Sequence, residues 1–351
     1  MNPSSATLKD VARVARVHFT TVSLALRGSP SIPEKTLNRI RRAAERLNYT
    51  PNPVFAALTR SRLGRREWRA PPRIAYLVNR SREMGFYRLD HHRQLLKGAR
   101  SQAKALGYDL ELLFVAEDHH DSESLSAYLQ SKQIIGLVIA AFEPGLALLV
   151  LDWTHYAVVI IDSQHMPSTG ILVSSDQLQI VRLAFRQMRA HGYRRVGLAV
   201  SLADEDGTNH RYTEGYLIEQ AMLPAAERVP ALLFPYDADE TALSSLLGRW
   251  VRRHHIDAIL CNRGDLNALL ATAGARGRVG VAFACLRLPD GSSQLAGVEA
   301  NLRTVGVKAV SLLAAQLKSN HRGIPAFAST TYVQGHWKDG ASAPRHHQRH
   351  A

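Results

Sequence analysis

Cysteine is almost absent from this sequence, since Cys261 and Cys285 are the only two in 351 residues. Two thiols cannot build a disulfide framework and lack the paired spacing of a structural zinc site, so we expect both to be buried and reduced. Long apolar runs are also missing. No stretch approaches the roughly 18 residues that span a bilayer, and the first ten residues have no apolar signal-peptide core. The sequence therefore predicts a cytoplasmic protein with no membrane partner.

The motifs of the common enzyme classes are missing as well. The chain has no glycine loop that would cradle phosphates, no nucleophile elbow and no metal-ligand helix motif. Its adjacent histidine pairs cannot readily share one metal, because neighbouring side chains of a helix or strand point in different directions. The pairs are His91 and His92, His119 and His120, and His254 and His255. We therefore expect no enzyme activity, no bound metal and no cofactor.

Acidic residues are scarce near the start of the chain. Residues 1–73 contain fifteen Lys and Arg against four Asp and Glu, whereas the remaining 278 residues contain 29 and 26. A localised basic segment attracts phosphate groups, although a charge run is also compatible with a plain solvated face. Charge alone therefore leaves both interpretations open, and the spacing of the apolar and capping residues in this segment has to decide between them.

Residues 1–50 contain three short helical patterns. Thr7 can cap an amphipathic stretch at 8–15, and a second apolar face follows at 19–26. Ser31 and Pro33 then supply a capping hydroxyl and a proline at the first position of a longer, arginine-rich helix. Three helices of this size predict one small bundle.

After a basic linker, the sequence pattern changes to apolar strands that alternate with amphipathic helices. This alternation is typical of a doubly wound α/β fold with parallel sheets. The predicted strands are 74–78, 110–115, 136–141, 158–161 and 196–200, and the predicted helices are 94–106, 122–131 and 177–190.

Four short motifs in the first fifty-three residues resemble one family. They are TLKDVA at 7–12, TTVSLAL at 20–26, PEKT at 33–36 and LNYTPNP at 47–53. In this order they closely resemble the headpiece of the lactose and galactose repressor (LacI/GalR) family. Further pieces are similar to the family's periplasmic-binding-protein-like core, namely GARSQAKALGY at 98–108, IGLVI at 135–139 and HGYRRV at 191–196.

The resemblance implies an all-α helix-turn-helix headpiece plus an α/β periplasmic-binding-protein-like core of two doubly wound lobes. The domains it implies are a DNA-binding domain at 6–50, a hinge helix at 51–63, a linker at 64–73, an effector-binding and dimerisation domain at 74–340 and a flexible tail at 341–351. It further implies a transcriptional repressor that binds a pseudo-palindromic DNA operator as a homodimer and responds to a small-molecule effector of carbohydrate type.

The resemblance also implies which residues contact DNA. In a helix-turn-helix the second helix enters the major groove with its first residues facing base edges. The implied set is Thr7, Phe19, Thr20, Thr21, Ser23, Leu24, Arg27 and Ser31. Leu24 cannot form a hydrogen bond and can pack only on an apolar group such as a thymine methyl. The alternative is that Phe19 and Leu24 belong to the core of the bundle.

The hinge implies a second mode of contact with DNA. In the family, two hinge helices pair over the operator centre and a leucine from each enters the minor groove, where it kinks the duplex. Leu58 matches that leucine and Asn52 matches the hinge asparagine. Unstacking a base step costs energy that the additional contacts of a bent site repay. A plain interdomain linker, with Leu58 packed on the core, is the alternative.

Candidate effector contacts by the same resemblance are Asn79, Asp162 and Arg211, although Asp162 and Arg211 are equally compatible with surface loops. The sequence departs from the family where relatives carry an Asn-Asp pair, here Asn262-Arg263, and where they carry a later aspartate, here Cys285-Leu286. Because those acids normally hold sugar hydroxyls, the effector differs from a common sugar or is absent. An effector-independent or architectural DNA-binding protein is therefore the alternative function.

Overall fold

The computed structural model describes most of the chain. The described residues are 8–26, 32–47, 49, 71–79, 86, 89–118, 122–140, 151–162, 170–235, 238–264 and 280–345. No helix in these ranges has the length and hydropathy of a membrane span.

The first described residues form the predicted three-helix bundle. It consists of α1 (Leu8–Ala15), α2 (Phe19–Leu26) and α3 (Glu34–Arg46). Their small apolar side chains form a separate core made of Val11, Ala12, Ala15, Val22, Ala25, Ile40, Ala43 and Ala44. Pro33 is the N-cap of α3, one residue before the first helical position where the sequence placed it. Small residues at the contacts let the three helices approach closely.

The turn between α1 and α2 contains an unusual backbone conformation. Arg16 has φ 48°, in the left-handed region, and its amide donates a hydrogen bond to the Arg13 carbonyl at 3.3 Å. Glycine is the usual residue at such a position, because a Cβ atom makes the left-handed conformation costly. Arginine at this position therefore makes the turn less stable than glycine would.

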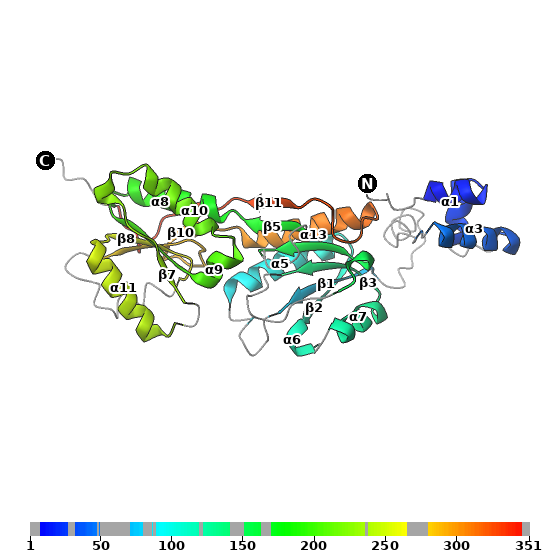
Figure 1. Ribbon diagram of the computed structural model, residues 1–351, viewed down its shortest axis with the longest axis horizontal. Helices are drawn as coiled ribbons and strands as arrows, with labels where there is room; N and C mark the ends of the chain where they lie inside the picture. Colours follow the sequence, from blue (N-terminus) through cyan, green and yellow to red (C-terminus); the bar gives the residue numbers. More distant parts are fainter. Residues whose placement is uncertain are drawn as a thin grey trace.

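The first lobe is built on a parallel sheet in the order β11-β5-β4-β3-β1-β2. One face of the sheet is covered by α5 (Asp90–Ala105) and α13 (Leu302–Lys318), and the other by α7 (Ser122–Ser131) (Figure 1). The short α6 (Val115–Asp118) and η2 (Trp153–His155) lie in connections. The strands are β1 (Arg73–Val78), β2 (Asp109–Phe114), β3 (Ile134–Ile139), β4 (Ala157–Ile161), β5 (Ile171–Ser175) and β11 (Ser329–Val333).

The second lobe repeats this architecture in the order β12-β10-β9-β8-β6-β7. Helices α8 (Gln177–Ala190) and α10 (Arg211–Ala221) cover one face and α11 (Glu240–His254) the other. Two shorter helices are α9 (Leu202–Gly207) and η3 (Ala225–Glu227). The strands are β6 (Val196–Ser201), β7 (Leu232–Phe234), β8 (Ala258–Cys261), β9 (Ala282–Cys285), β10 (Ala296–Glu299) and β12 (His336–Lys338). The sheet departs from the predicted all-parallel arrangement at its edge, because β12 is antiparallel to β10.

In the part of the chain that the structure describes, the chain passes between the two lobes three times, after β5, after β10 and after β11. The crossing segments are bonded to one another. The Asp176 amide donates to the Val333 carbonyl at 3.0 Å, and Asn301 Nδ2 donates to the Gln334 carbonyl at 2.7 Å. The three connections therefore form one hydrogen-bonded bundle at the junction of the lobes.

Helices α5 and α13 lie against each other although about 200 residues separate them, as the cyan and orange ribbons show (Figure 1). A Cβ atom at Gly98 would lie 1.9 Å from the Arg303 carbonyl oxygen, and one at Gly306 would lie 2.1 Å from the Leu95 carbonyl oxygen. Only glycine allows the two backbones to approach this closely.

The expected flexible tail does not begin at residue 341. Ser342 Oγ donates to the Phe283 carbonyl at 2.7 Å and accepts from the Ala296 amide at 2.8 Å. Ala343 is buried, and Tyr193 Oη donates to the Pro344 carbonyl at 2.7 Å. Residues 341–345 therefore pack on the second lobe, because these hydrogen bonds hold them to its strands, and residues 346–351 lie outside the described residues.

Candidate DNA-binding surface and interlobe cleft

Helix α2 exposes the side chains that the family resemblance assigned to base contacts. Phe19 is 45% exposed and Leu24 is 39% exposed, whereas Val22 and Ala25 point into the bundle core. Thr20 is exposed, and Thr21 and Ser23 are partly exposed. The alternative that Phe19 and Leu24 belong to the core is therefore wrong, and α2 presents a mixed apolar and hydroxyl surface.

His18 stands immediately before α2. Its Nδ1 lies 2.8 Å from Thr20 Oγ1, and its ring centroid lies 4.4 Å from that of Phe19. The imidazole therefore contacts the side chains of the next two residues in the chain. These contacts restrict the rotamers of Thr20 and Phe19 and so position them at the start of the helix.

The basic residues of the bundle lie mainly on α3. Arg39, Arg41, Arg42 and Arg46 are all exposed, and Arg13 on α1 forms an ion pair with Asp10. The bundle therefore presents guanidinium groups to solvent, and guanidinium groups bind phosphate oxygens well.

The remaining predicted DNA contacts lie outside the described residues. These are Thr7, Arg27 and Ser31 of the headpiece and Asn52 and Leu58 of the hinge. Their roles stay predictions.

In the α/β part, the candidate effector residues follow parallel strands of the first lobe. Asn79 comes directly after β1 and is buried, and Asp162 comes directly after β4 with φ 47°. Ligands of open α/β sheets bind beyond the carboxyl ends of the strands, so both residues have the position that a cleft residue requires.

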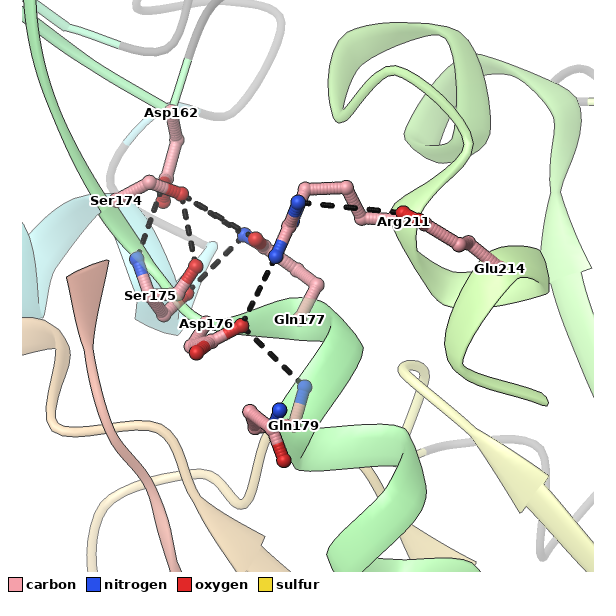
Figure 2. Close-up of polar contacts among 8 residues, drawn as sticks. All are labelled: Asp162, Ser174, Ser175, Asp176, Gln177, Gln179, Arg211 and Glu214. Atoms are coloured by element: carbon pink, nitrogen blue, oxygen red, sulfur yellow. Dashed lines mark hydrogen bonds and ion pairs between the residues drawn. The ribbon is translucent and has the colours of Figure 1, made fainter. Parts of the chain in front are cut away.

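Asp162 is the centre of a polar network at this edge (Figure 2). Its Oδ1 accepts a hydrogen bond from the Ser175 amide at 3.3 Å, and Gln177 Nε2 donates to the hydroxyls of Ser174 and Ser175, both at 3.2 Å. Burial raises the pKa of the Asp162 carboxyl, while the Ser174 hydroxyl and the charge of Arg287 act in the opposite direction. The network fixes the carboxyl group and rules out the plain surface loop.

Arg211 belongs to the junction of the lobes. Its Nη2 lies 3.2 Å from Asp176 Oδ1, the acceptor that also caps α8 through the Gln179 amide (Figure 2). The guanidinium carbon lies 4.4 Å from the centroid of the Tyr332 ring on β11. Arg211 therefore connects α10 of the second lobe to two of the crossing segments, and it is not a plain surface residue either.

The structure adds two residues of the second lobe, at the carboxyl ends of neighbouring strands, that sequence reasoning missed as candidates. Asn262 follows β8 and Arg287 follows β9, and the two strands are neighbours with Cys261 opposite Cys285. Arg287 Nη2 lies 3.9 Å from Asp204 Oδ1 on α9. Their positions after strand ends were visible in the sequence, but only the fold shows which strands are adjacent.

Glu205 stabilises the start of α10 from inside the second lobe. It is fully buried, and its Oε1 accepts a hydrogen bond from the Thr213 amide at 2.9 Å. Its other oxygen lies 3.5 Å from His210 Nδ1. Burial raises the pKa of the Glu205 carboxyl, and the Thr213 and His210 contacts only partly oppose that rise. The two thiols are buried as expected, and burial raises the pKa of Cys261.

No cluster of three or more His, Cys, Asp or Glu side chains able to hold a metal occurs within the ranges that the structure describes.

A basic helical bundle with an exposed second helix, joined to two similar α/β lobes that enclose a polar junction, defines a helix-turn-helix regulator with a binding-protein-like sensor module. Comparisons with known proteins agree with this class. Residues 7–52 match the family model described as "Bacterial regulatory proteins, lacI family". Residues 76–282 match "Periplasmic binding proteins and sugar binding domain of LacI family".

Two relatives and one solved structure illustrate the similarity. The repressor PurR of Pectobacterium carotovorum is 24% identical over 284 residues, which cover 77% of this chain and 75% of the relative. The probable repressor ExuR of Bacillus subtilis is 56% identical over 46 residues, covering 13% of this chain and 14% of that protein. The lac repressor dimer bound to operator and the anti-inducer ONPF has a TM-score of 0.52 at 16% identity, covering 97% of this chain and 99% of that one.

The chain belongs to the LacI family and combines its helix-turn-helix domain with its effector-binding domain. It is a transcriptional repressor of that family, whose members are regulators rather than enzymes.

Proposed function

We propose that the protein represses transcription as a homodimer that binds a pseudo-palindromic operator. A small molecule of carbohydrate type that binds between the lobes changes its affinity for DNA. The observation that carries the proposal is the exposure of Phe19, Thr20 and Leu24 on α2, because groove contacts need these side chains outside the core. One such helix spans only a few base pairs. Two headpieces related by a two-fold axis give useful specificity.

The surface of α2 favours an operator with thymine in each half-site. Leu24 offers methyl groups and no hydrogen-bonding atom, so its favourable base contact in the major groove is the C5 methyl of thymine. Thr20, Thr21 and Ser23 supply hydroxyls for bases or phosphates. Burial of one methyl group contributes about 0.8 kcal/mol, which is about a fourfold change in affinity per half-site and about fifteenfold for two.

The hydrogen-bonded crossing segments support coupling between the cleft and the DNA. A ligand that contacts both lobes favours one angle between them, and the DNA-binding form is favoured or disfavoured accordingly. Asn79, Asp162 and Arg211 are the proposed effector contacts. The first two follow strand ends, and the third holds the crossing segments.

The test is selection of bound sequences from a random duplex pool with the full chain, followed by affinity measurements on the selected site. We expect a two-fold symmetric motif with thymine in each half-site. Replacing those thymines by uracil, which lacks the methyl group, should weaken binding by about fifteenfold. Leu24→Ala should bind both duplexes alike, whereas Val14→Ala, which removes an exposed apolar side chain from α1, should keep the difference.

Three results would count against the proposal or its parts. A motif without two-fold symmetry contradicts the dimeric operator. Equal affinity for selected and random duplexes favours an architectural DNA-binding protein instead. Leu58→Ala binding the selected site as tightly as the unchanged chain contradicts the predicted contact of the hinge with the minor groove.

A further inference from the structure

At the carboxyl ends of its strands, the second lobe has hydrogen-bond donors with few acceptors, and this asymmetry bears on the chemistry of the effector. Strands β8 and β9 run parallel with Cys261 opposite Cys285, so the residues that follow them lie at the same edge of the second sheet. Those residues include Asn262 and Arg287. Arg287 Nη2 lies 3.9 Å from Asp204 Oδ1 on α9, and the charge of Arg287 opposes the rise that burial causes in the pKa of the Asp162 carboxyl of the first lobe.

The carboxylates of this region already have partners. Asp204 accepts a hydrogen bond from Ser201 Oγ at 2.5 Å, and Asp162 accepts one from the Ser175 amide at 3.3 Å. Asp176 accepts from the Gln179 amide and from Arg211. These bonds use part of the acceptor capacity of each carboxylate, so effector hydroxyls can still donate to it, but the carboxylates are not left without donors.

The donors of the second lobe are in the opposite situation. Asn262 is 4% exposed, and its buried Nδ2 makes no hydrogen bond of normal geometry among the described residues; its side chain acts only on the Tyr212 hydroxyl, where it lowers the pKa against the larger rise that burial causes. The Arg287 side chain is 21% exposed, and its one ion pair in the described chain is the 3.9 Å contact with Asp204, which is longer than a hydrogen bond. Buried donors without acceptors are unfavourable, so a ligand that supplies acceptor oxygens gains affinity here.

The second residue after β9 brings a positive charge to this edge of the sheet. Here Cys285 and Leu286 are followed by a guanidinium with five donors, whose preferred partner is a carboxylate or a phosphate.

We propose that the effector is a small polyhydroxylated anion whose carboxylate or phosphate oxygens accept hydrogen bonds from Arg287 and Asn262. This inference rests on the proposed function of the α/β part as an effector sensor, and it replaces a neutral sugar by an acidic one. Asp162 and Asn79 then contact the hydroxyl groups from the first lobe, so that one ligand contacts both lobes.

The experiment is a thermal-shift and calorimetric comparison of the full chain with four probes at equal ionic strength. D-glucose is the neutral reference, D-glucuronate and D-gluconate carry a carboxylate, and D-glucose 6-phosphate carries a phosphate. We expect at least one acid to raise the melting temperature while glucose leaves it unchanged. Comparison of the three acids separates a carboxylate ligand from a phosphate ligand.

Variants assign the effect to the proposed donors. Arg287→Gln should lower affinity for the active acid by about 10- to 100-fold, as expected for loss of a charged hydrogen bond. Arg287→Lys should keep part of the affinity, and Asn262→Asp should lower it by placing a negative charge beside the anion. Arg249→Gln, which removes an exposed arginine from α11, should leave it unchanged.

The outcomes separate this inference from the proposed function. If only glucose shifts the melting temperature, if none of the acids does, or if Arg287→Lys and Asn262→Asp bind the active acid as the unchanged chain does, the anionic effector is refuted. Operator affinity is measured on the same preparations by fluorescence anisotropy. Tight operator binding without any acid response overturns the inference alone, whereas loss of specific DNA binding overturns the proposed function itself.

Discussion

Removing the charge of Arg211 should weaken the junction of the lobes by an amount that the structure allows us to estimate. Arg211 and Asp176 are 3.2 Å apart, and their side chains are only 21% and 13% exposed. A hydrogen bond between charged groups at such a site contributes about 1.5 kcal/mol, at the low end of its range because some solvent reaches the pair. Stacking on Tyr332, which is 38% exposed, adds about 0.5 kcal/mol.

The expected total for Arg211→Gln is therefore about 2 kcal/mol in the free energy of unfolding, or about a thirtyfold change in the equilibrium constant. Urea unfolding of the full chain, followed by tryptophan fluorescence, measures this quantity. The informative design is a double-mutant cycle with Asp176→Asn, since asparagine still caps α8 but carries no charge. A second cycle with Tyr332→Leu isolates the stacking contribution, and Tyr332→Phe is its control.

We expect a coupling energy of about 1.5 kcal/mol between Arg211 and Asp176, and about 0.5 kcal/mol between Arg211 and Tyr332. The same variants should also alter the response of DNA binding to an effector, because they loosen the crossing segments. Coupling energies below about 0.3 kcal/mol in both cycles would show that Arg211 is not a structural link between the lobes.

Three further changes test other parts of the structure. Arg16→Gly should raise the melting temperature of the headpiece relative to Arg16→Ala by an amount equivalent to about 1 kcal/mol, because only glycine relieves the left-handed conformation; equal melting temperatures would contradict this. Gly98→Ala should destabilise the first lobe by about 2 kcal/mol or more in urea unfolding, since its Cβ meets the backbone of α13, while Gly280→Ala, which has open space, should not. The carboxyl of Glu205 has a raised pKa in the folded state, so its contribution to stability is present below the ordinary glutamate pKa and is lost as pH rises through the raised value. The free energy of unfolding should be measured from about pH 4, near the ordinary glutamate pKa, to about pH 7, well above it. Over this range the unchanged chain should lose stability relative to Glu205→Gln, and a constant difference between the two would refute the assignment.

Much of the local structure was predictable from residue patterns. The helices predicted at 122–131 and 177–190 have the same bounds in the structure, because each is bounded by clear start and stop signals. Helix α5 begins at Asp90, four residues before the predicted start at 94, since the histidines at its beginning interrupt the apolar pattern without interrupting the helix. The predicted start of a helix is therefore wrong where polar residues occupy its first turn.

The division into lobes and the composition of the cleft were not predictable in the same way. Each lobe combines strands from distant parts of the chain, and no local periodicity records that β11 lies beside β5 or that β12 lies beside β10. Asn79 and Asp162 came from the resemblance to the family, and in the structure both follow strand ends. Arg287 was missed because the sequence departs from the family pattern there, and its electrostatic effect on the Asp162 carboxyl of the other lobe depends on how the two lobes meet.

The placement of α13 has a consequence for synthesis of the protein on the ribosome. The first lobe starts with β1 but needs α13 and β11, which are translated only after nearly the whole second lobe. The headpiece, in contrast, uses only local contacts, and such units fold early and fast. During translation, a nascent chain therefore holds a folded headpiece well before its sensor is complete, and chains that terminate before residue 302 would lack the helix that closes the first lobe.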